Sequence, residues 1–412
     1  MSRVLVDSGV SWLGKIPDSW STCRVKNKFL FHKIIAKEKS VNYDRIALTL
    51  NGVIKRDKDD SSGLQPDNYN GYQIVYKDDL IFKLIDLENV NTSRIGKSEY
   101  EGITSPAYIV LTDKCNTRYS LYYFLNMWYQ EIFNNIGGDG VRSAINKDDL
   151  LRVPFIDISI GEQNKIAKYL DKQCAKIDEI INDNNREVEL LEEYKRTILK
   201  NELGNKVGSK KYRIKNIANL KGRIGWQGLT TADYIEEGPY LITGVDFNES
   251  KGSINWESCV HISEERYEEA PEIHVLPNDL LITKDGTIGK LAIISENREA
   301  SLNSGVMLIR IKDKSVCNVK YLYYLLKSDY FWDWYNSSQR GSSTIKHLYQ
   351  EQFYNFSFFL PDLAHQEKVI KKIDDQFFKL DQVINYRKQI IEKLEEYKRS
   401  LIFECVTGKR EV

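Results

Sequence analysis

The 412-residue sequence has few cysteines, few histidines and no excess of charge of either sign. Its six cysteines are scattered without a CxxC pair, which favours a reducing compartment and argues against a zinc site. The five histidines are isolated from one another, without metal-ligand spacing. The 59 basic residues balance the 59 acidic ones. Composition therefore gives no support to nucleic-acid binding, although it leaves local basic patches open.

The sequence also lacks long apolar runs and the glycine-rich motifs of nucleotide-binding proteins. No stretch is long and apolar enough to span a bilayer, and no signal peptide opens the chain. We therefore expect a soluble, cytoplasmic protein without a membrane partner. Neither GxxxxGK[ST] nor GxGxxG after a strand occurs, and GTIGK at 286–290 is too short for a phosphate-binding loop. We expect neither a cofactor nor a metal, and no active site.

A long repeated segment is the strongest positive feature of the sequence. Residues 161–204 and 365–408 align without a gap from Gln163 onto Gln366, at an offset of 203 positions. The run LEEYKR at 191–196 returns intact at 394–399. Because a long-period repeat reflects a duplicated structural unit, we expect two equivalent halves.

Each copy is predicted to form one long helix whose apolar seam uses two positions of a seven-residue frame. The first position holds Leu170, Ile177, Leu191 and Ile198 in one copy, and Ile373, Leu380, Leu394 and Leu401 in the other. The second position holds Ile166, Ile180 and Tyr194, and then Val369, Val383, Ile390 and Tyr397. Such heptads predict that the two helices pack on each other as a coiled coil, and the block between them makes an antiparallel arrangement the simplest. Separate surface helices are the alternative.

Capping and polar residues support this prediction. The start signals are Ser159 with Glu162, a capping-box pattern, and Asp362; the expected stops are Gly204 and Gly408. Asn184 and Arg387 occupy equivalent places in the seam. A polar residue there commonly fixes the register of a helix pair at a cost in stability.

Two globular blocks precede the helices. The first contains short apolar stretches, such as 43–50 and 71–76, that are typical of strands, and a helical pattern at 118–133. The second repeats the same order of segments. We therefore predict domain 1 at 1–155, a first long helix at 156–205, domain 2 at 206–357 and a second long helix at 358–412.

The two blocks correspond segment by segment although their sequences are only weakly similar. YRIKNIANL matches CRVKNKFLF, NSGVMLIRIKD matches SPAYIVLTD, and KYLYYLLKSDYFWDWY matches YSLYYFLNMWYQEIF. The predicted fold is mixed α+β, with two globular domains joined by two long antiparallel helices. Two equal units joined in this way are related by a pseudo-twofold axis, a symmetry that duplex DNA shares.

In this order, the motifs resemble the specificity (S) subunit of type I restriction–modification systems. The matching residues are WLG at 12–14 with Ile16, Pro17 and Trp20, the hairpin KDGTIGK at 284–290, the proline-to-glutamine entries Pro154 to Gln163 and Pro361 to Gln366, and the duplicated LEEYKR. No single motif is specific, but their order spans the whole chain. The first block has Ile95-Gly96-Lys97 where the second has TIGK, so its contacts are harder to place.

The resemblance implies a DNA-recognition subunit without catalysis of its own. Each globular block would be a target recognition domain that recognises one half of a split sequence in double-stranded DNA. The helices would set the length of the unread gap and bind two methyltransferase (M) subunits, which use S-adenosylmethionine to methylate adenine. Two restriction/translocase (R) subunits would join for cleavage.

The candidate contact residues are polar and basic side chains near the hairpins and loops. In the second domain they are Lys284, Thr287, Lys290, Arg340, Ser342, Ser343, Thr344, Lys346, Arg223, Trp226 and Gln227. In the first domain they are Asn91, Thr92, Ser93, Arg94, Lys97, Arg142, Ser143, Asn146 and Lys147. The candidate docking residues for M recur on both helices: Asp171, Asp178, Lys195 and Arg196, and Asp374, Asp381, Lys398 and Arg399.

Three alternatives stay open. The KDGTIGK segment can be a tight hairpin whose glycines only turn the chain. The repeated helix charges can form a solvated face. The whole chain can be a coiled-coil scaffold whose globular ends bind protein. Loss of DNA binding with rising salt, measured in complex with the partner, would favour DNA recognition over the scaffold.

Overall fold

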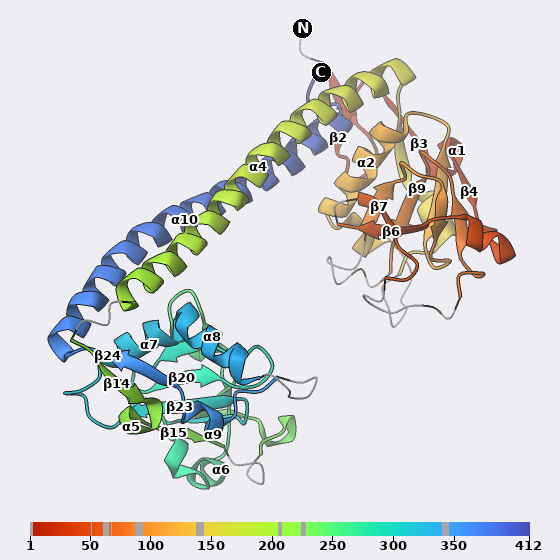
Figure 1. The fold of residues 1–412 in the computed structure, drawn as a ribbon. Helices are drawn as coiled ribbons and strands as arrows, with labels where there is room; N and C mark the ends of the chain where they lie inside the picture. Colours follow the sequence, from red (N-terminus) through yellow and green to blue (C-terminus); the bar gives the residue numbers. More distant parts are fainter. Residues whose placement is uncertain are drawn as a thin grey trace. The chain divides into compact units, whose positions relative to one another are not determined.

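The computed structural model describes residues 3–50, 52–60, 66, 68–85, 87, 94–136, 144–204, 208–223, 228–339 and 346–412. Two compact units make up the chain: residues 1–185 with 388–412, and residues 186–387. Each unit contains sheets and short helices together with part of each of two long helices (Figure 1). The mixed α+β fold expected from the sequence is confirmed.

The two long helices have 44 residues each. They are α4 (Ile160–Leu203) and α10 (Leu363–Val406). The amide of Glu162 donates to Ser159 Oγ at 3.2 Å, and the amide of His365 donates to Asp362 Oδ1 at 2.8 Å. Both predicted N-terminal caps are therefore confirmed.

The apolar seam of the long helices follows one of its two predicted positions and departs from the other. Residues of the first position, such as Ile177 and Ile373, are buried. At the second position Ile166 and Val369 are buried as predicted, but four residues that lie further along the helices are exposed: Ile180 by 46%, Tyr194 by 54%, Val383 by 40% and Tyr397 by 51%. The second seam position lies one residue later, where Cys174, Phe377 and Ile384 are buried. The Ile-Ile pairs at 180–181 and 390–391 fit both the predicted seam position and the one that follows it. This ambiguity explains the wrong prediction.

Ion pairs in the second unit show that α4 and α10 run in opposite directions. They are Glu187–Arg387 at 2.9 Å, Lys195–Asp381 at 2.7 Å and Glu202–Lys372 at 2.6 Å. Residue numbers rise along α4 as they fall along α10, so the helices are antiparallel. The polar seam residue Arg387 is thus held by an ion pair. In the first unit the other one, Asn184, is buried and donates to the carbonyl of Ile180 at 2.7 Å.

The first unit is built around two sheets. Its other elements are β1 (Leu5–Asp7), β2 (Lys15–Pro17), β3 (Ser21–Arg24), α1 (Val25–Lys28), β4 (Phe29–His32), β5 (Ile34–Ile35), η1 (Lys37–Asn42), β6 (Arg45–Thr49), β7 (Gly52–Arg56), β8 (Gln73–Val75), β9 (Leu80–Lys83), β10 (Arg94–Lys97), β11 (Gly102–Thr104), β12 (Ile109–Asp113), α2 (Thr117–Tyr129), η2 (Ile132–Asn135), α3 (Lys147–Arg152) and β13 (Pro154–Asp157). The sheets have the orders β10-β9-β12-β4 and β5-β8-β11-β6-β7. The helix predicted at 118–133 therefore ends at Tyr129, before a short 3-10 helix.

The four-stranded sheet of the first unit separates two apolar layers. Leu80 and Phe82 belong to the main core with helix α2, and the ring centroids of Phe82 and Phe124 lie 4.9 Å apart, edge to face. Ile81 and Val110 belong to the cluster on the second sheet. This alternation is the period of two expected of a strand that is covered on both faces.

The second unit has the same kind of architecture. Its other elements are β14 (Lys210–Arg213), α5 (Ile214–Ile217), β15 (Ala218–Gly222), η4 (Thr231–Asp233), β16 (Ile235–Ile242), β17 (Phe247–Asn248), β18 (Ser253–Ile254), η5 (Trp256–Ser258), β19 (Val260–His261), α6 (Glu264–Glu268), η6 (Pro271–Ile273), β20 (Leu280–Thr283), β21 (Leu291–Ile293), β22 (Ala300–Leu302), β23 (Val306–Ile311), α7 (Val319–Lys327), α8 (Asp329–Ser338), α9 (Gln350–Phe353) and β24 (Ser357–Leu360). The larger sheet has the order β15-β23-β20-β21, and the smaller one the order β19-β16-β22.

The two units share one topology. The order β21-β20-β23-β15 corresponds strand for strand to β10-β9-β12-β4, and β16 pairs with β22 in parallel as β6 does with β11. The turn before the central strand is repeated too. Asp78 and Asn278 have φ values of 70° and 73°, and each precedes a buried aspartate, Asp79 or Asp279. The segment-by-segment correspondence predicted from the sequence is confirmed.

Candidate nucleic-acid interface

The hairpin predicted at 284–290 joins β20 to β21 and is fixed by Thr283. The hydroxyl of Thr283 donates to the carbonyl of Thr287 at 2.6 Å and accepts from the amide of Lys290 at 3.0 Å. Gly289 has a φ of 89°, and a Cβ there would lie 2.4 Å from the ring of Trp332. The positive φ and the close packing against Trp332 thus explain why a glycine occupies this position. The side chain that the hairpin offers to a ligand is the exposed Thr287.

A hydrogen-bonded cluster joins this hairpin to residues 346–348. Asp285 accepts from Lys284 Nζ at 2.8 Å and lies 2.5 Å from His347 Nδ1, and the amide of Leu348 donates to the carbonyl of Lys284 at 3.0 Å. Burial alone would raise the pKa of Asp285. Hydrogen bonds from Lys284 and His347 outweigh burial and hold that pKa below its usual value. The exposed Lys346 therefore lies next in sequence to a segment that is fixed to the hairpin.

Two other candidates of the second domain already have partners inside it. Lys290 Nζ lies 3.4 Å from Glu249 Oε1. Arg223 is 5% exposed and donates to the carbonyl of Leu302 at 2.8 Å and to Ser301 Oγ at 2.9 Å. Burial lowers the pKa of Arg223. These contacts give Arg223 a structural role, and its predicted DNA contact stays a prediction. The candidates outside the described residues are Trp226, Gln227, Arg340, Ser342, Ser343 and Thr344.

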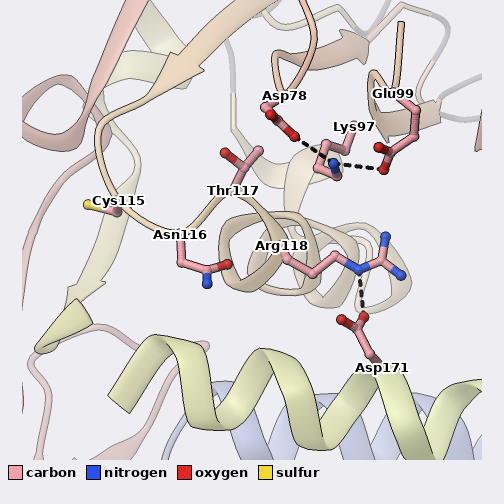
Figure 2. A pocket seen from close by; sticks show the side chains of 8 residues that line it. All are labelled: Asp78, Lys97, Glu99, Cys115, Asn116, Thr117, Arg118 and Asp171. Atoms are coloured by element: carbon pink, nitrogen blue, oxygen red, sulfur yellow. Dashed lines mark hydrogen bonds and ion pairs between the residues drawn. The ribbon is translucent and has the colours of Figure 1, made fainter. Parts of the chain in front are cut away.

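In the first unit, Lys97 lies in a pocket whose charged side chains are all paired. Its Nζ lies 2.8 Å from Asp78 Oδ1 and 2.7 Å from Glu99 Oε1, and Arg118 Nε lies 2.5 Å from Asp171 Oδ1 (Figure 2). The pocket has a volume of about 560 Å³. Burial lowers the pKa of Lys97, but hydrogen bonds to both carboxylates outweigh it and raise that pKa. A DNA contact would break both ion pairs of a side chain that is 10% exposed, so we remove Lys97 from the interface.

The remaining candidates of the first domain have mixed surroundings. Asn146 Oδ1 accepts from the amides of residues 148 and 149 and so caps α3. Lys147 is exposed, with its Nζ 5.2 Å from the ring centroid of Phe31. Arg94 begins β10 and is half-buried. The candidates outside the described residues are Asn91, Thr92, Ser93, Arg142 and Ser143, and so is the turn predicted at 137–140.

Four of the predicted docking residues form ion pairs between the two long helices. Asp178 pairs with Lys398 at 2.6 Å in the first unit, and Lys195 pairs with Asp381 at 2.7 Å in the second. The offset of 203 positions between the copies converts one pair into the other. The fold itself therefore uses these repeated charges, whether or not a partner does.

The other repeated aspartates fasten each long helix to its globular domain. Asp171 accepts from Arg118 and, at 2.8 Å, from the hydroxyl of Tyr122. Asp374 pairs with Lys320 at 2.6 Å and accepts from Tyr324. Arg196 and Arg399 are the exposed members of the predicted docking set. The guanidinium carbon of Arg399 lies 5.5 Å from the ring centroid of Tyr129.

Two buried glutamines have a role that the sequence did not reveal. Gln163 accepts from the amide of Asn116 at 3.0 Å and donates to the carbonyl of Ile158 at 3.1 Å. Gln366 likewise accepts from the amide of Asn318 at 2.8 Å, and donates to the carbonyls of residues 316 and 361. Each glutamine thus connects the first turn of a long helix to the start of α2 or α7. The recurrence of these glutamines in both copies was the sequence signal that could have predicted a shared role.

Several sites are absent from the part of the chain that the structure describes. Within it, no helix is long and apolar enough to cross a membrane. No group of three or more histidine, cysteine, aspartate or glutamate side chains there has an arrangement that could hold a metal ion. All six cysteines of the sequence are described, and all are free thiols.

Comparison with known proteins identifies the relatives of this chain. Residues 206–396 match the family described as "Type I restriction modification DNA specificity domain". The EcoBI type I restriction enzyme specificity subunit from Escherichia coli is 23% identical over 450 residues, which cover 99% of this chain and 90% of that protein. A solved chain from a study of type I R-M complex assembly and conformational transition has a TM-score of 0.69 at 13% identity, covering 96% of this chain and 100% of its own length.

A further structure is less similar in shape. The HsdS subunit from Thermoanaerobacter tengcongensis covers 96% of this chain and 98% of its own length at 14% identity, with a TM-score of 0.44. That score is too low to bear on the fold.

The structure shows two domains of one topology together with two long antiparallel helices. Over nearly its whole length the chain is similar to a type I restriction–modification specificity subunit, and residues 206–396 match the DNA specificity domain; together these findings support a role in DNA sequence recognition. The coiled-coil scaffold that binds only protein is the less favoured alternative.

Proposed function

We propose that this chain recognises a split sequence in double-stranded DNA, and that residues 1–155 and 206–357 each recognise one half of it. The observation that carries the proposal is the repeated strand order of the two units, because the second of them lies in the stretch that matches a DNA specificity domain. Two domains with one topology provide two equivalent recognition surfaces, as twofold DNA-binding proteins use for their half-sites.

In the second domain we place the contact surface on the 284–290 hairpin and on Lys346, with residues 340–345 beside it in sequence. Thr287 can donate and accept hydrogen bonds at base edges, whereas a lysine suits phosphates. In the first domain the corresponding surface comprises Lys147, Arg94 and the stretches 91–93 and 142–143. Because the chain carries no net charge, its affinity for DNA has to come from such local groups.

The long helices are proposed to set the unread gap between the two half-sites. Forty-four helical residues extend about 66 Å, and the matched lengths of α4 and α10 keep the antiparallel register. Inserting one heptad at equivalent positions of both helices adds about 10 Å, which corresponds to about 3 base pairs at 3.4 Å each. We expect the gap in the recognised sequence to lengthen by about that amount while both half-sites stay the same. A changed half-site would contradict the proposal.

The same helices are proposed to bind two M subunits. Exposed apolar side chains repeat on them at the offset of 203 positions: Ile180 with Val383, and Tyr194 with Tyr397. The exposed pair Arg196 and Arg399 repeats as well. Two similar surfaces suit two identical partners. We therefore move the proposed docking surface from the aspartates and lysines of the internal ion pairs to these six residues.

The chain is proposed to act as a non-catalytic adaptor in the cytoplasm. The M subunits would bind S-adenosylmethionine and methylate adenine, and two R subunits would add cleavage. The adaptor itself needs no cofactor for DNA recognition, since hydrogen bonds and charge suffice for it.

Methylation sequencing tests the proposal. The chain and its neighbouring methyltransferase gene are expressed in a host free of adenine methylation, and the whole genome is sequenced for methylated bases. We expect a split motif with a fixed gap, which disappears when this chain is omitted. Co-purification of the two proteins without any motif would instead favour the scaffold alternative.

A further inference from the structure

One pocket of the second unit contains lysines whose charge is not balanced within it. It has a volume of about 220 Å³ and lies where α7 and the turn between β17 and β18 meet the long helices. Its charged lining consists of Lys195, Lys251, Lys320 and Lys327 against Asp374 and Asp381. Two lysines are used in ion pairs, Lys195 with Asp381 at 2.7 Å and Lys320 with Asp374 at 2.6 Å. The other two lysines of the lining, Lys251 and Lys327, have no aspartate of the lining as an ion-pair partner.

Lys327 is the unusual member of this pocket. It is the last residue of α7 and is partly buried. Among the described residues, no carboxylate forms an ion pair with it. Its Nζ instead lies 3.4 Å from the hydroxyl of Tyr323 and 5.6 Å from the centroid of that ring. Burial lowers the pKa of Lys327 and the neighbouring Lys195 lowers it further, and together they outweigh the opposite effect of Glu192, Asp381 and Glu249. An ammonium group that is partly removed from water and has no carboxylate in direct contact is unfavourable for the folded state.

The first unit shows that the fold does not need this lysine. Helices α2 and α7 align at an offset of 202 positions, which places Arg118 on Lys320 and Leu125 on Lys327. The ion pair of Arg118 in the first unit recurs as that of Lys320 in the second. Two turns further along the helix, however, the first unit has the apolar Leu125 where the second has Lys327. Lys327 is therefore not shared by the two units, so the common fold does not require it. A bound anion would stabilise its ammonium group.

We propose that this pocket binds one phosphate group per chain, as inorganic phosphate or as a phosphomonoester, between Lys327 and Lys251. Two surplus positive charges match the two negative charges of a phosphate dianion. Ammonium groups form strong, charge-assisted hydrogen bonds with phosphate oxygens. A phosphodiester of the DNA backbone carries a single negative charge and is linked to a nucleoside on both sides. It therefore fits this small pocket less well than a phosphomonoester does. The proposal stands independently of DNA recognition and of M docking.

Calorimetric titration of the full chain with inorganic phosphate, at constant ionic strength set with chloride, tests the proposal. AMP is the phosphomonoester probe, and a non-target duplex is the phosphodiester probe. We expect one saturable site per chain for inorganic phosphate or AMP, and none of that affinity for the duplex. Lys327→Leu, which installs the residue of the first unit, is expected to weaken binding at least tenfold. The control Lys371→Leu changes an exposed lysine of the same unit and is expected to bind like the wild type.

Folding is checked separately from binding. Without phosphate, Lys327→Leu is expected to unfold at or above the wild-type temperature, because it removes a partly buried ammonium group that forms no ion pair among the described residues. With phosphate, the wild type gains thermal stability and this variant does not. Lys251→Ala, at an exposed position, is a second variant that leaves the core unchanged and is expected to weaken binding. Equal binding by wild type and Lys327→Leu, two equivalent sites per chain, or no saturable binding up to about 10 mM would each overturn the proposal.

Discussion

The two halves of this chain keep one topology but use different side chains around a buried aspartate that both contain. In the first unit, Asp79 accepts from Thr112 Oγ1 at 2.7 Å and lies 3.0 Å from His32 Nε2. In the second, Asp279 accepts two hydrogen bonds from Arg310, at 2.8 and 2.6 Å. The aspartate before the central strand is thus shared, whereas its partner is not. The duplicated fold constrains the turn and leaves the neighbouring positions free to diverge.

The same contrast holds for the residues expected to contact ligands. Lys97 in the first unit is neutralised by two carboxylates, whereas Thr287 and Lys346 in the second are exposed. Leu125 corresponds to Lys327 on the matching helix. The halves therefore differ at these candidate ligand positions as well as around the buried aspartates, while the strand order stays the same. This is what a duplicated protein requires in order to recognise two different half-sites.

The seam of the long helices should respond alike in both halves. Ile384→Ala removes a side chain that is 2% exposed and is expected to lower the free energy of unfolding by about 3 kcal/mol. Ile181→Ala, at the equivalent place in the first half, is expected to cost about 2 kcal/mol because Ile181 is less buried. The adjacent controls Ile180→Ala and Val383→Ala should each cost about 0.5 kcal/mol or less. Urea unfolding measures the free energy of unfolding of all four variants. Larger losses in the two controls would show that Ile180 and Val383 belong to the seam, as the sequence predicted.

The buried aspartates should distinguish the halves. Asp279→Ala leaves the guanidinium of Arg310 without its carboxylate and is expected to cost about 3 kcal/mol. Asp79→Ala removes the hydrogen-bond acceptor of the uncharged Thr112 hydroxyl and is expected to cost about 2 kcal/mol. Asp333→Ala, at an exposed position, is the control. Denaturant titration measures the unfolding free energy of each variant. Equal losses for the two buried aspartates would contradict the expectation that their different partners matter for stability.

DNA affinity should depend on the exposed lysine and not on the paired one. In complex with the M partner, Lys346→Ala is expected to weaken DNA binding by about 1 kcal/mol and to reduce the salt slope by about 1. Lys97→Ala is expected to leave both unchanged, because its ion pairs already neutralise it. Fluorescence anisotropy at several salt concentrations gives both quantities. The reverse result would return Lys97 to the interface.

The Asp285 cluster should make a small, pH-dependent contribution in the second half. Because the folded pKa of Asp285 lies below the unfolded value of 3.8, its stabilising effect is complete above that value and is lost as the pH falls through the folded pKa. The carboxylate is about one-third exposed, so we expect less than about 1 kcal/mol. Asp285→Asn should lower stability at pH 6 and approach the wild type below pH 3.8. A constant difference across that range would show that the aspartate acts in another way.

Local signals in the sequence predicted the framework of the structure. The caps at Ser159 and Asp362, the repeat that begins at Gln163 and Gln366, and the order of segments along each block all follow from short-range patterns. The first seam position also follows, because isolated apolar residues such as Ile177 mark one face of a helix. These features depend on residues that are close in sequence, so a single chain reveals them.

Contacts between distant residues explain what the sequence could not show. Arg223 resembles a surface base contact until Leu302 and Ser301 are seen around it. The repeated Asp178 and Lys398 resemble docking charges until they are found paired. In both cases the partner is separated from the residue by a long stretch of chain, and no periodic pattern connects the two. The docking and DNA surfaces remain proposals for the same reason, since the partners that define them lie outside this chain.

The most direct test of the central claim, two equivalent domains that each recognise one half-site, is an exchange of domains. Residues 206–357 are replaced by the corresponding domain of another specificity subunit, and the methylated motif is determined by genome-wide sequencing in a host free of adenine methylation. The account predicts that one half-site changes to that of the donor, while the other half-site and the gap length stay the same. A change in both half-sites, or in neither, would contradict it.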